Sequence, residues 1–499
     1  MKFQNCTILA FAILCIIFTK VTCETEAVTD GTTTTTPEPP KKKTPVKDSK
    51  LCKKCSCVIN DNTSLLDCSE KLAGDWFTSD EWKDLIDGDV VFKTIKLEHN
   101  NLTAIPALPP YGVENLYLAF NQIENVTLGA FQNLSELVNL DISHNKLTTK
   151  TLVPDVFQGP YSISDYKPLP KLRSLNLGYN DLHSLDADIF EHCPQLEELV
   201  LCSNPFQIIN KNAEVAISGL AYLKTLDISY LEIDSLPETV LHGPRDLNTL
   251  LAAGNEFKRL PDGLEYAQNL VHLVLNENPI ENLVGDNVFP EMTNLKYLSM
   301  TFMPKLYKIG PGAFSELQNL TELILSDNKF LNEIDELAFP KNVTGGPYLD
   351  YPPLEHFYLN NCNLTVLPKP LLVRWDKVKV LDLQYNPWTC DASNDYLINV
   401  LIGQVNKTSP VLARNVQCAS PEGLKDVPVL RVANEHLVEN PGGSLVWIGL
   451  LVVLLIAIPT IVAAYAIKKR GCFGRFRRSD SVANRALYNR TSFNEDFHI

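Results

Sequence analysis

Three things are scarce in this 499-residue sequence, and each scarcity narrows what the chain can do. Positive charge is the first, since 44 Lys and Arg stand against 59 Asp and Glu, for a net charge of −15. Nucleic acid and heparin require basic patches, so we exclude both as ligands. Catalytic signatures are the second, because the chain has no nucleophile elbow, H-E-x-x-H pair or phosphate loop. We therefore expect no enzyme activity, metal or cofactor.

Long apolar runs are the third scarce feature, and only two of them bear on membrane targeting. Residues 1–23 (MKFQNCTILAFAILCIIFTKVTC) have an early lysine and an apolar centre that stops at Phe18. That centre is too short to span a bilayer, so we predict a cleaved secretory signal peptide.

The second run, residues 445–467, holds 23 residues without a charge. At about 1.5 Å per residue a helix of this length can cross the roughly 30 Å hydrocarbon layer, and Pro459 is tolerated there. Basic residues 468–470 follow at once, and the positive-inside rule places them in the cytoplasm. The sequence predicts a type I single-pass protein of the plasma membrane with its N-terminus outside.

Charge divides across that predicted membrane. The tail, residues 468–499, has eight Lys or Arg against three acids, and the signal peptide adds two lysines. The mature outer portion is therefore left with a net charge near −22. Residues 24–50 are rich in Thr, Pro and Lys with almost nothing apolar, so we expect a disordered leader, open to O-glycosylation.

Between Phe92 and Asn386 the chain repeats the phrase L-x-x-L-x-L-x-x-N at a spacing near 24 residues. Residues 172–180 read LRSLNLGYN, and residues 270–278 read LVHLVLNEN. A fixed period of this size predicts a solenoid, in which each unit buries its leucines only against its neighbours. The second inner apolar residue of each unit stands at Leu97, Leu118, Ile142, Leu177, Leu201, Ile228, Ala252, Leu275, Met300, Leu325, Leu359 and Leu383.

The asparagine that ends each phrase has a predicted mechanical role. A short strand that turns sharply leaves backbone groups needing partners, and a buried Asn amide can bond its own turn and the next unit. The ladder positions are Asn100, Asn121, Asn145, Asn180, Asn204, Asn255, Asn278, Asn328 and Asn386. Three units depart, with Leu231, Met303 and Cys362, of which only Cys362 keeps a weak donor. We expect local irregularity at the other two.

Nine cysteines lie in the mature outer portion. The close group of Cys52, Cys55, Cys57 and Cys68 indicates disulfides in a secreted chain, because zinc sites favour reducing compartments. An odd total leaves at least one free thiol or an intermolecular bridge. Whether Cys193 and Cys202 pair is left open, although their expected side-chain directions are opposite.

With these features the chain resembles the extracellular leucine-rich-repeat proteins of the typical 24-residue class, over roughly residues 51–432. The resemblance implies a horseshoe-shaped α/β-type solenoid with a parallel concave β-sheet of about twelve strands, an irregular or 3-10 convex side and cysteine caps. It implies the pairs Cys52–Cys57 and Cys55–Cys68 in the first cap. In the second cap Ala392 replaces an expected cysteine and no outer cysteine follows Cys418, so one disulfide, Cys390–Cys418, is expected.

These expectations divide the chain into eight parts. They are a signal peptide (1–23), leader (24–50), N-terminal cap (51–90), repeats (91–387), C-terminal cap (388–432), stalk (433–444), transmembrane helix (445–467) and tail (468–499).

The concave face is the predicted partner-binding surface. Side chains alternate between the faces of a strand, so non-leucine positions of the phrase should line it. Exposed aromatic and apolar residues on a rigid sheet are typical of protein interfaces, although strand propensity alone also favours them. The candidate contact residues are Tyr117, Phe120, Tyr179, Val200, Tyr230, Leu251, Val274, Phe302, Ile324, Tyr358 and Tyr385.

Modification motifs lie away from that face. The expected N-glycosylation sites are Asn62, Asn101, Asn125, Asn133, Asn319, Asn342, Asn363 and Asn406. In the tail, Cys472 is a candidate for palmitoylation, and Phe497 with Ile499 forms an ending that a PDZ domain or another cytoplasmic adaptor could bind.

The sequence favours a cell-surface receptor or adhesion protein that binds an extracellular or cell-surface protein through its concave face. The alternative is a signalling co-receptor or innate-immune recognition protein that presents a soluble ligand to another receptor. The tail has no room for a Toll-type domain, so we expect no signalling domain there.

Overall fold

The computed structural model describes residues 49–60, 63–159, 161–162, 165–166, 169–285, 288–342, 349–372, 374–438 and 441–469. The chain forms two compact units, residues 1–438 and 439–499, and each is described by itself. Several predictions lie outside the described residues: the signal peptide, residues 24–48 of the leader, Asn62, Cys472, Phe497 and Ile499.

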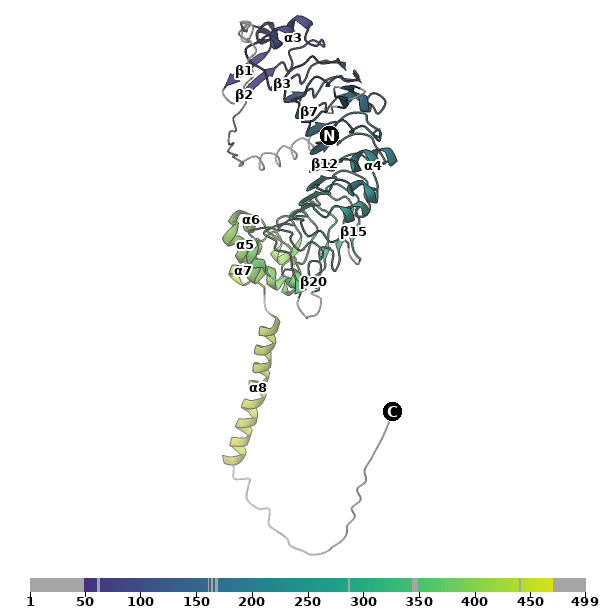
Figure 1. Ribbon diagram of the computed structural model, residues 1–499. Helices are drawn as coiled ribbons and strands as arrows, with labels where there is room; N and C mark the ends of the chain where they lie inside the picture. Colours follow the sequence, from purple (N-terminus) through teal and green to yellow (C-terminus); the bar gives the residue numbers. More distant parts are fainter. Residues whose placement is uncertain are drawn as a thin grey trace, which may run out of the picture. The chain divides into compact units, whose positions relative to one another are not determined.

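The first unit is an arc built on one 14-stranded sheet (Figure 1). In spatial order its strands are β1 (Ser56–Asn60), β2 (Thr63–Asp67), β3 (Thr94–Lys96), β5 (Asn115–Tyr117), β7 (Asn139–Asp141), β10 (Ser174–Asn176), β11 (Glu198–Val200), β12 (Thr225–Asp227), β13 (Thr249–Leu251), β14 (His272–Val274), β16 (Tyr297–Ser299), β18 (Glu322–Ile324), β22 (His356–Tyr358) and β23 (Val380–Asp382). The repeats supply the twelve strands from β3 to β23, all paired in parallel; the N-terminal cap adds the antiparallel hairpin β1–β2.

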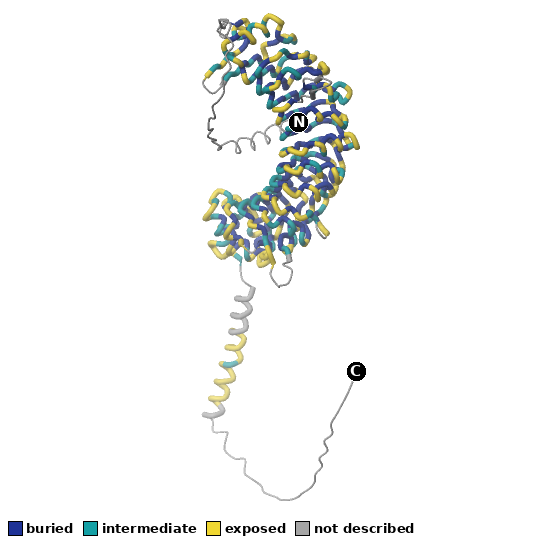
Figure 2. Tube along the Cα trace, viewed as in Figure 1, coloured by how far each residue is buried: buried dark blue, intermediate teal, exposed yellow. Residues whose placement is uncertain are grey.

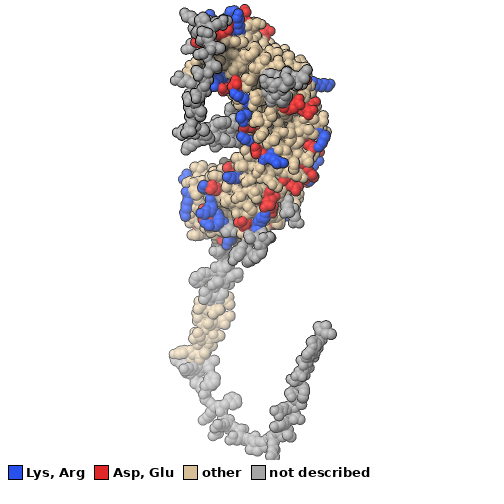
Figure 3. All heavy atoms as spheres, in the orientation of Figure 1, with Lys and Arg blue, Asp and Glu red and all other residues tan. Residues whose placement is uncertain are grey.

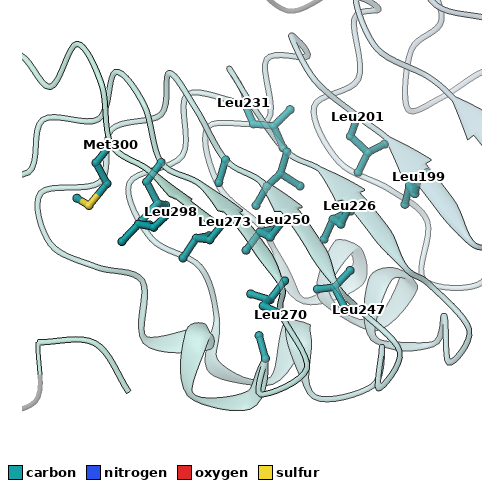
Figure 4. Close-up of a cluster of buried hydrophobic side chains, with 14 of the residues drawn as sticks. Leu199, Leu201, Leu226, Leu231, Leu247, Leu250, Leu270, Leu273, Leu298 and Met300 are labelled. Atoms are coloured by element: carbon teal, nitrogen blue, oxygen red, sulfur yellow. The ribbon is translucent and has the colours of Figure 1, made fainter. Parts of the chain in front are cut away.

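The register of the sheet explains the leucine phrase. Each repeat strand has three residues, and its central apolar residue, leucine in all but β3 and β22, pairs with the central residue of the next strand, as Leu175 does with Leu199 and Leu199 with Leu226. These leucines point into the core between the sheet and the outer side of the arc, where they pack in layers (Figure 4). Burial therefore runs continuously along the inside of the stack (Figure 2), as expected where each unit is covered only by its neighbours.

The outer side of the arc is irregular, as the resemblance implies, with one regular helix. It carries α4 (Lys211–Ser218) and short 3-10 turns, and α4 begins at Asn210, whose side chain accepts the N–H of Ala213. The 3-10 segments are η2 (Pro154–Phe157), η3 (Glu238–Leu241), η4 (Asp262–Tyr266), η5 (Lys369–Leu371), η6 (Trp375–Lys377), η7 (Ala392–Asn394) and η9 (Glu422–Leu424). Two small sheets accompany them. One pairs β4 (Ala104–Ile105) with β6 (Asn125–Val126), and the other has three strands in the order β15 (Asn282–Leu283), β17 (Lys308–Ile309) and β19 (Glu333–Ile334).

Two long insertions between repeats each contain a pair of short antiparallel strands. The first joins β8 (Tyr161–Ser162) to β9 (Asp165–Tyr166), and the second joins β20 (Lys341–Asn342) to β21 (Leu349–Asp350).

Phenylalanines fill the outer half of the core. Phe289 and Phe314 have ring centroids 6.0 Å apart, Phe314 and Phe339 5.1 Å, and Phe339 and Phe357 5.8 Å. All four side chains are fully buried. Aromatic pairs at such distances stabilise beyond the area they bury, so this row links four consecutive units.

The asparagine ladder forms, but in the opposite direction to the one expected. Asn328 donates from Nδ2 to the carbonyls of Leu325 in its own turn and Met300 in the preceding unit, both at 2.8 Å. Its Oδ1 accepts the N–H of Met303, also in the preceding unit, at 2.8 Å. Cys362 replaces this donor with Sγ, 3.1 Å from the carbonyl oxygen of Leu325. The ladder amides therefore hydrogen-bond to the preceding unit, because the strand that each amide follows ends at the level of the turn in that unit.

Both ends of the arc are closed by disulfide-bearing caps. The first contains α2 (Lys50–Lys54) and α3 (Ser79–Ile86), the second α5 (Ile402–Thr408), α6 (Pro410–Arg414), α7 (Val429–Glu435), the π-helical segment η8 (Leu397–Leu401) and the pair β24 (Trp388–Thr389) with β25 (Cys418–Ser420). The disulfides are Cys52–Cys57, Cys55–Cys68 and Cys390–Cys418, the pairs that the resemblance implies. The C-terminal boundary expected at 432 is wrong, because α7 continues to Glu435 and Val438 still packs on the core.

The second unit contains α8 (Pro441–Lys469), which covers the apolar run 445–467 and begins inside the stretch expected to be a stalk. Large apolar side chains between Leu451 and Tyr465 are exposed along it. Among the helices of the described residues, none combines the length and apolar content that crossing a membrane requires.

Candidate functional site: the concave face

Four positions of the phrase L-x-x-L-x-L-x-x-N line the inner side of the arc: positions 3, 5, 7 and 8. Positions 3 and 5 are the two ends of each strand and flank its buried leucine, as Ser174 and Asn176 flank Leu175. Sequence reasoning selected positions 5 and 8 and missed position 3, which holds His272, Tyr297 and His356. The period-two alternation of a strand was the available signal, since residues 3 and 5 must share a face.

Position 8 reaches the inner face for a reason other than strand alternation. All twelve of its residues have left-handed backbone, with φ between 51° and 65°. From His99 to Asn361 the N–H of each of these eleven residues is held by the position-7 carbonyl of the next unit, as in His99 to Ala119 and Phe302 to Ser326. Because the strand has already ended, a left-handed turn sets the direction of these side chains. Position 8 forms a column with a rigid backbone.

At the N-terminal end of this column four rings stack face to face. The centroids of His99 and Phe120 are 4.4 Å apart, those of Phe120 and His144 3.9 Å, and those of His144 and Tyr179 3.9 Å. The planes in each pair lie within 10° to 14° of parallel. Neighbouring strands lie about 4.8 Å apart, so one ring per strand at a fixed position stacks without distortion. We name these four residues the ring ladder.

The next aromatic in the column is held differently. The ring of Tyr230 lies over Gly254 and fills the space that an added Cβ would occupy. Its hydroxyl donates to Glu277 Oε1 at 2.7 Å, two units along. Gly254 is thus required for the space that the tyrosine ring occupies, since other residue types adopt the same left-handed φ at position 8.

The eleven predicted contact residues differ in accessibility. Phe120, Phe302 and Tyr385 are exposed, at 40%, 56% and 68%. Those that are half-buried are Tyr117, Tyr179, Val200, Tyr230, Leu251, Ile324 and Tyr358. Val274 is a wrong prediction as a contact, because only 2% of it is exposed. The concave side of a bent stack crowds adjacent strands, so a short side chain there is covered by longer neighbours.

Acidic and amide residues at position 5 have a structural task. Asp141 accepts the N–H of Ser143 at 2.8 Å, Asn176 that of Gly178 at 3.0 Å, and Asp382 that of Gln384 at 3.1 Å. These short side-chain turns end the strand before the left-handed residue. Burial raises the pKa of the Asp141 carboxyl, and hydrogen bonds from Ser143 oppose the rise.

The tyrosines of the face lie in a negative field. Burial raises the pKa of the Tyr117 hydroxyl, and three carboxylates raise it further: those of Asp141, Glu98 and Glu198. The pKa of Tyr358 is also raised, first by burial and then by Glu322 and Asp382. Both tyrosines are therefore neutral donors at physiological pH.

The ring ladder predicts a specific acid sensitivity. Burial, followed by repulsion from His99, lowers the pKa of His144 to about 4 from its usual 6.5. Between these values the unfolded chain binds the extra proton, so stability falls as the pH falls. Acidification from about pH 7 to pH 4 should cost the wild type about 1–2 kcal/mol more than His144→Phe, after allowance for solvent screening. Urea unfolding at a series of pH values measures this difference.

The control for that experiment is His183→Phe, which removes an exposed histidine outside the ladder. It should lose stability with pH as the wild type does. Equal acid sensitivity of His144→Phe and His183→Phe would show that the ladder histidine does not carry the effect.

Among the described residues, the three cysteines outside the disulfides are buried. Burial raises the pKa of the Cys193 thiol, and of the Cys362 thiol, to about 12, so neither is a reactive thiolate. Cys193 is free, so the bridge to Cys202 does not form. Cys202 is also buried, with 4% of it exposed, and hydrogen-bonds Asp227.

The described glycosylation motifs avoid the four concave columns. Asn101, Asn125, Asn319 and Asn363 are exposed, and Asn133 and Asn406 are half-buried. Asn342 lies in β20, where only the backbone is described. Glycans at these positions would leave the inner face accessible to a protein.

Comparison with known proteins identifies the repeat. A leucine rich repeat family model matches residues 112–164, 170–215 and 268–330. Osteomodulin of Bos taurus is 30% identical over 54% of this chain and 57% of its own length; lumican of Mus musculus is 28% identical over 58% and 77%. The CD180 antigen of Mus musculus is 25% identical over 60% of this chain and 38% of its own. The chain spans about half the length of the first of these curated relatives.

Among solved structures, the Toll–Spätzle complex, described as a molecular hub in Drosophila development and innate immunity, has 21% identity and a TM-score of 0.45. The match covers 70% of this chain and 55% of that one. The leucine-rich repeat domain of APL1B has 20% identity and a TM-score of 0.37, over 61% and 80%. The match to the family model shows leucine-rich repeats in residues 112–164, 170–215 and 268–330.

Proposed function

We propose that this leucine-rich-repeat chain is a cell-surface receptor or adhesion protein that binds a protein partner through its concave face. The observation that carries the proposal is position 8, where a rigid left-handed backbone presents three exposed aromatic side chains, Phe120, Phe302 and Tyr385. Large aromatics held in place lose little entropy on binding and are typical anchors of protein interfaces.

The surroundings of the face support binding by a protein. Exposed glycosylation motifs lie outside its columns, and its tyrosines are neutral hydrogen-bond donors. The face presents aromatic rings, hydroxyls and carboxylates on a fixed scaffold, and these groups suit recognition of a protein partner.

Substitution of the exposed rings tests the concave face. Phe302→Lys together with Tyr385→Lys should lower capture of cell-surface proteins by at least tenfold, because both rings are lost and charge enters the contact. The control is Tyr222→Lys, a residue 52% exposed and outside the four columns, which should capture as the wild type does. Equal capture by both variants, measured by pull-down and mass spectrometry, contradicts the concave-face assignment.

The membrane anchor is part of the proposal and rests on the sequence: the uncharged run 445–467 followed by three basic residues. The chain expressed in cells should stay in the membrane pellet after alkaline extraction, and release into the supernatant would exclude an anchor. Clustering of expressing cells that requires the outer portion supports adhesion; ligand-dependent complex formation without clustering supports the co-receptor alternative.

A further inference from the structure

We propose that the C-terminal half of the concave face binds an arginine side chain of a basic partner protein, between Glu277, Phe302 and Asp327. This inference rests on the proposed function and names the chemistry of its partner. The three residues are successive members of position 8, so the exposed ring of Phe302 stands between two carboxylates. We call this group the acid–aromatic clamp.

The clamp has the dimensions of a guanidinium site. Successive position-8 residues follow strands β14, β16 and β18, which neighbour one another in the sheet and lie about 4.8 Å apart. A guanidinium stacked on the Phe302 ring can therefore reach a carboxylate on either side. The planar guanidinium of arginine stacks on aromatic faces and binds a carboxylate through two parallel N–H groups. The ammonium of lysine is not planar and offers no such pair of parallel donors.

Both carboxylates are fixed by neutral donors. Glu277 accepts from the Tyr230 hydroxyl at 2.7 Å, and Asp327 accepts from the Asn361 amide at 2.5 Å. Both donors lie on the side of their carboxylate away from Phe302, and they are neutral, so they hold the two side chains without cancelling the negative charge of the clamp.

The edge of the same sheet shows the contrast. At position 2 the carboxylates are neutralised: Lys93 lies 2.7 Å from Glu114, Lys224 2.7 Å from Glu197, and Lys379 2.6 Å from Glu355. Acidic and basic groups are likewise interspersed over the face seen in Figure 3. The four concave columns instead hold eight acidic residues against Lys96 alone. An uncompensated charge in a concavity raises the local concentration of cations and favours a basic partner.

Two other occupants are excluded, a second copy of this chain by its charge and the basic cluster of the leader by its reach. A second copy carries an outer portion near −22 and would be repelled. The basic cluster Lys41–Lys43 precedes Ser49 by at least six residues and reaches about 28 Å at most. The clamp begins at β14, eight strand spacings from β2, or about 38 Å along the curved sheet. The occupant is therefore a separate basic protein.

Fluorescence anisotropy with a labelled nona-arginine peptide and the purified full chain in mild detergent tests the clamp. The combined variant Glu277→Gln, Asp327→Asn and Phe302→Ala should bind the peptide at least tenfold more weakly than the wild type. Gln and Asn can still accept from Tyr230 and Asn361, and an unchanged thermal midpoint shows that the fold is intact. Nona-lysine should bind the wild type several-fold more weakly than nona-arginine.

The matched control is Glu238→Gln with Glu265→Gln, which removes the same charge from an acidic cleft of about 650 Å³ on the outer side. It should keep wild-type affinity. Equal loss in control and clamp variants, or equal binding of the two peptides, overturns the inference. If that happens while Phe302→Lys with Tyr385→Lys still lowers partner capture, the partner class is wrong and the concave-face function stands.

Discussion

Phe314→Ala should destabilise the first unit by about 3–5 kcal/mol, the largest effect we expect from one side chain. Phe314 is fully buried and touches Phe289 on one side and Phe339 on the other, at 6.0 and 5.1 Å between centroids. Truncation leaves a cavity that these flanking rings cannot fill. Because each repeat is stabilised by its neighbours alone, a gap there also uncouples the units before it from those after it.

Urea unfolding followed by circular dichroism measures both consequences: a lower midpoint and a broader transition than in the wild type. The control is Phe330→Ala, which truncates a ring 59% exposed in the following repeat and should change stability by less than about 0.5 kcal/mol. A Phe314→Ala chain no less stable than Phe330→Ala would show that the phenylalanine row is not a continuous core.

Asn328→Leu should cost about 3–4 kcal/mol, although leucine suits the apolar surroundings and occurs naturally at the equivalent Leu231. The amide of Asn328 serves the carbonyls of Met300 and Leu325 and the N–H of Met303, all at 2.8 Å. Leucine leaves the carbonyl of Met300 and the N–H of Met303 without this partner, and Leu325 keeps only the weak thiol donor of Cys362. Each buried group left unpaired costs about 1–3 kcal/mol.

Leu231 escapes this cost through a local rearrangement. In the unit before it the N–H of Phe206 bonds the carbonyl of Asn204, and the N–H of Gln207 bonds the carbonyl of Leu231, both at 2.9 Å. Gln207 adopts a left-handed φ of 62° to do so. The expected irregularity at Leu231 is therefore present, as a changed turn in the preceding unit.

Asn332→Leu is the control for Asn328→Leu, because Asn332 is exposed four residues along the same repeat. It should stay within about 0.5 kcal/mol of the wild type in thermal or urea unfolding. If the two variants were equally stable, the ladder amide would be dispensable and the backward hydrogen bonds would not hold the turn.

The two sensitivities have different physical origins. The phenylalanine row stabilises by removing apolar area from water, whereas the asparagine ladder prevents a penalty for unpaired backbone groups. The first was visible as a recurring residue type. The sequence showed the positions of the ladder asparagines but not whether they bond to the preceding or the following unit, because a linear phrase does not say which neighbour lies level with a turn.

Local periodicity by itself determined the repeat architecture. Twelve phrases near a 24-residue spacing predict twelve parallel strands, and the central apolar residues pair in the expected register from β3 to β23. A period of two along each strand and a fixed period between strands leave one way to bury every leucine. The close spacing of the first four cysteines indicated disulfides, and the family resemblance implied which thiols pair in the caps.

Only the tertiary structure decided how the concave face is built. Left-handed backbone brought His99, Phe120, His144 and Tyr179 into one stack, and curvature buried Val274 while leaving Phe302 exposed. Contacts between units about 24 residues apart fixed Tyr230 over Gly254 and against Glu277. A periodic sequence specifies each unit, but the environment of a side chain at the face depends on residues from the units on either side, which the period does not constrain.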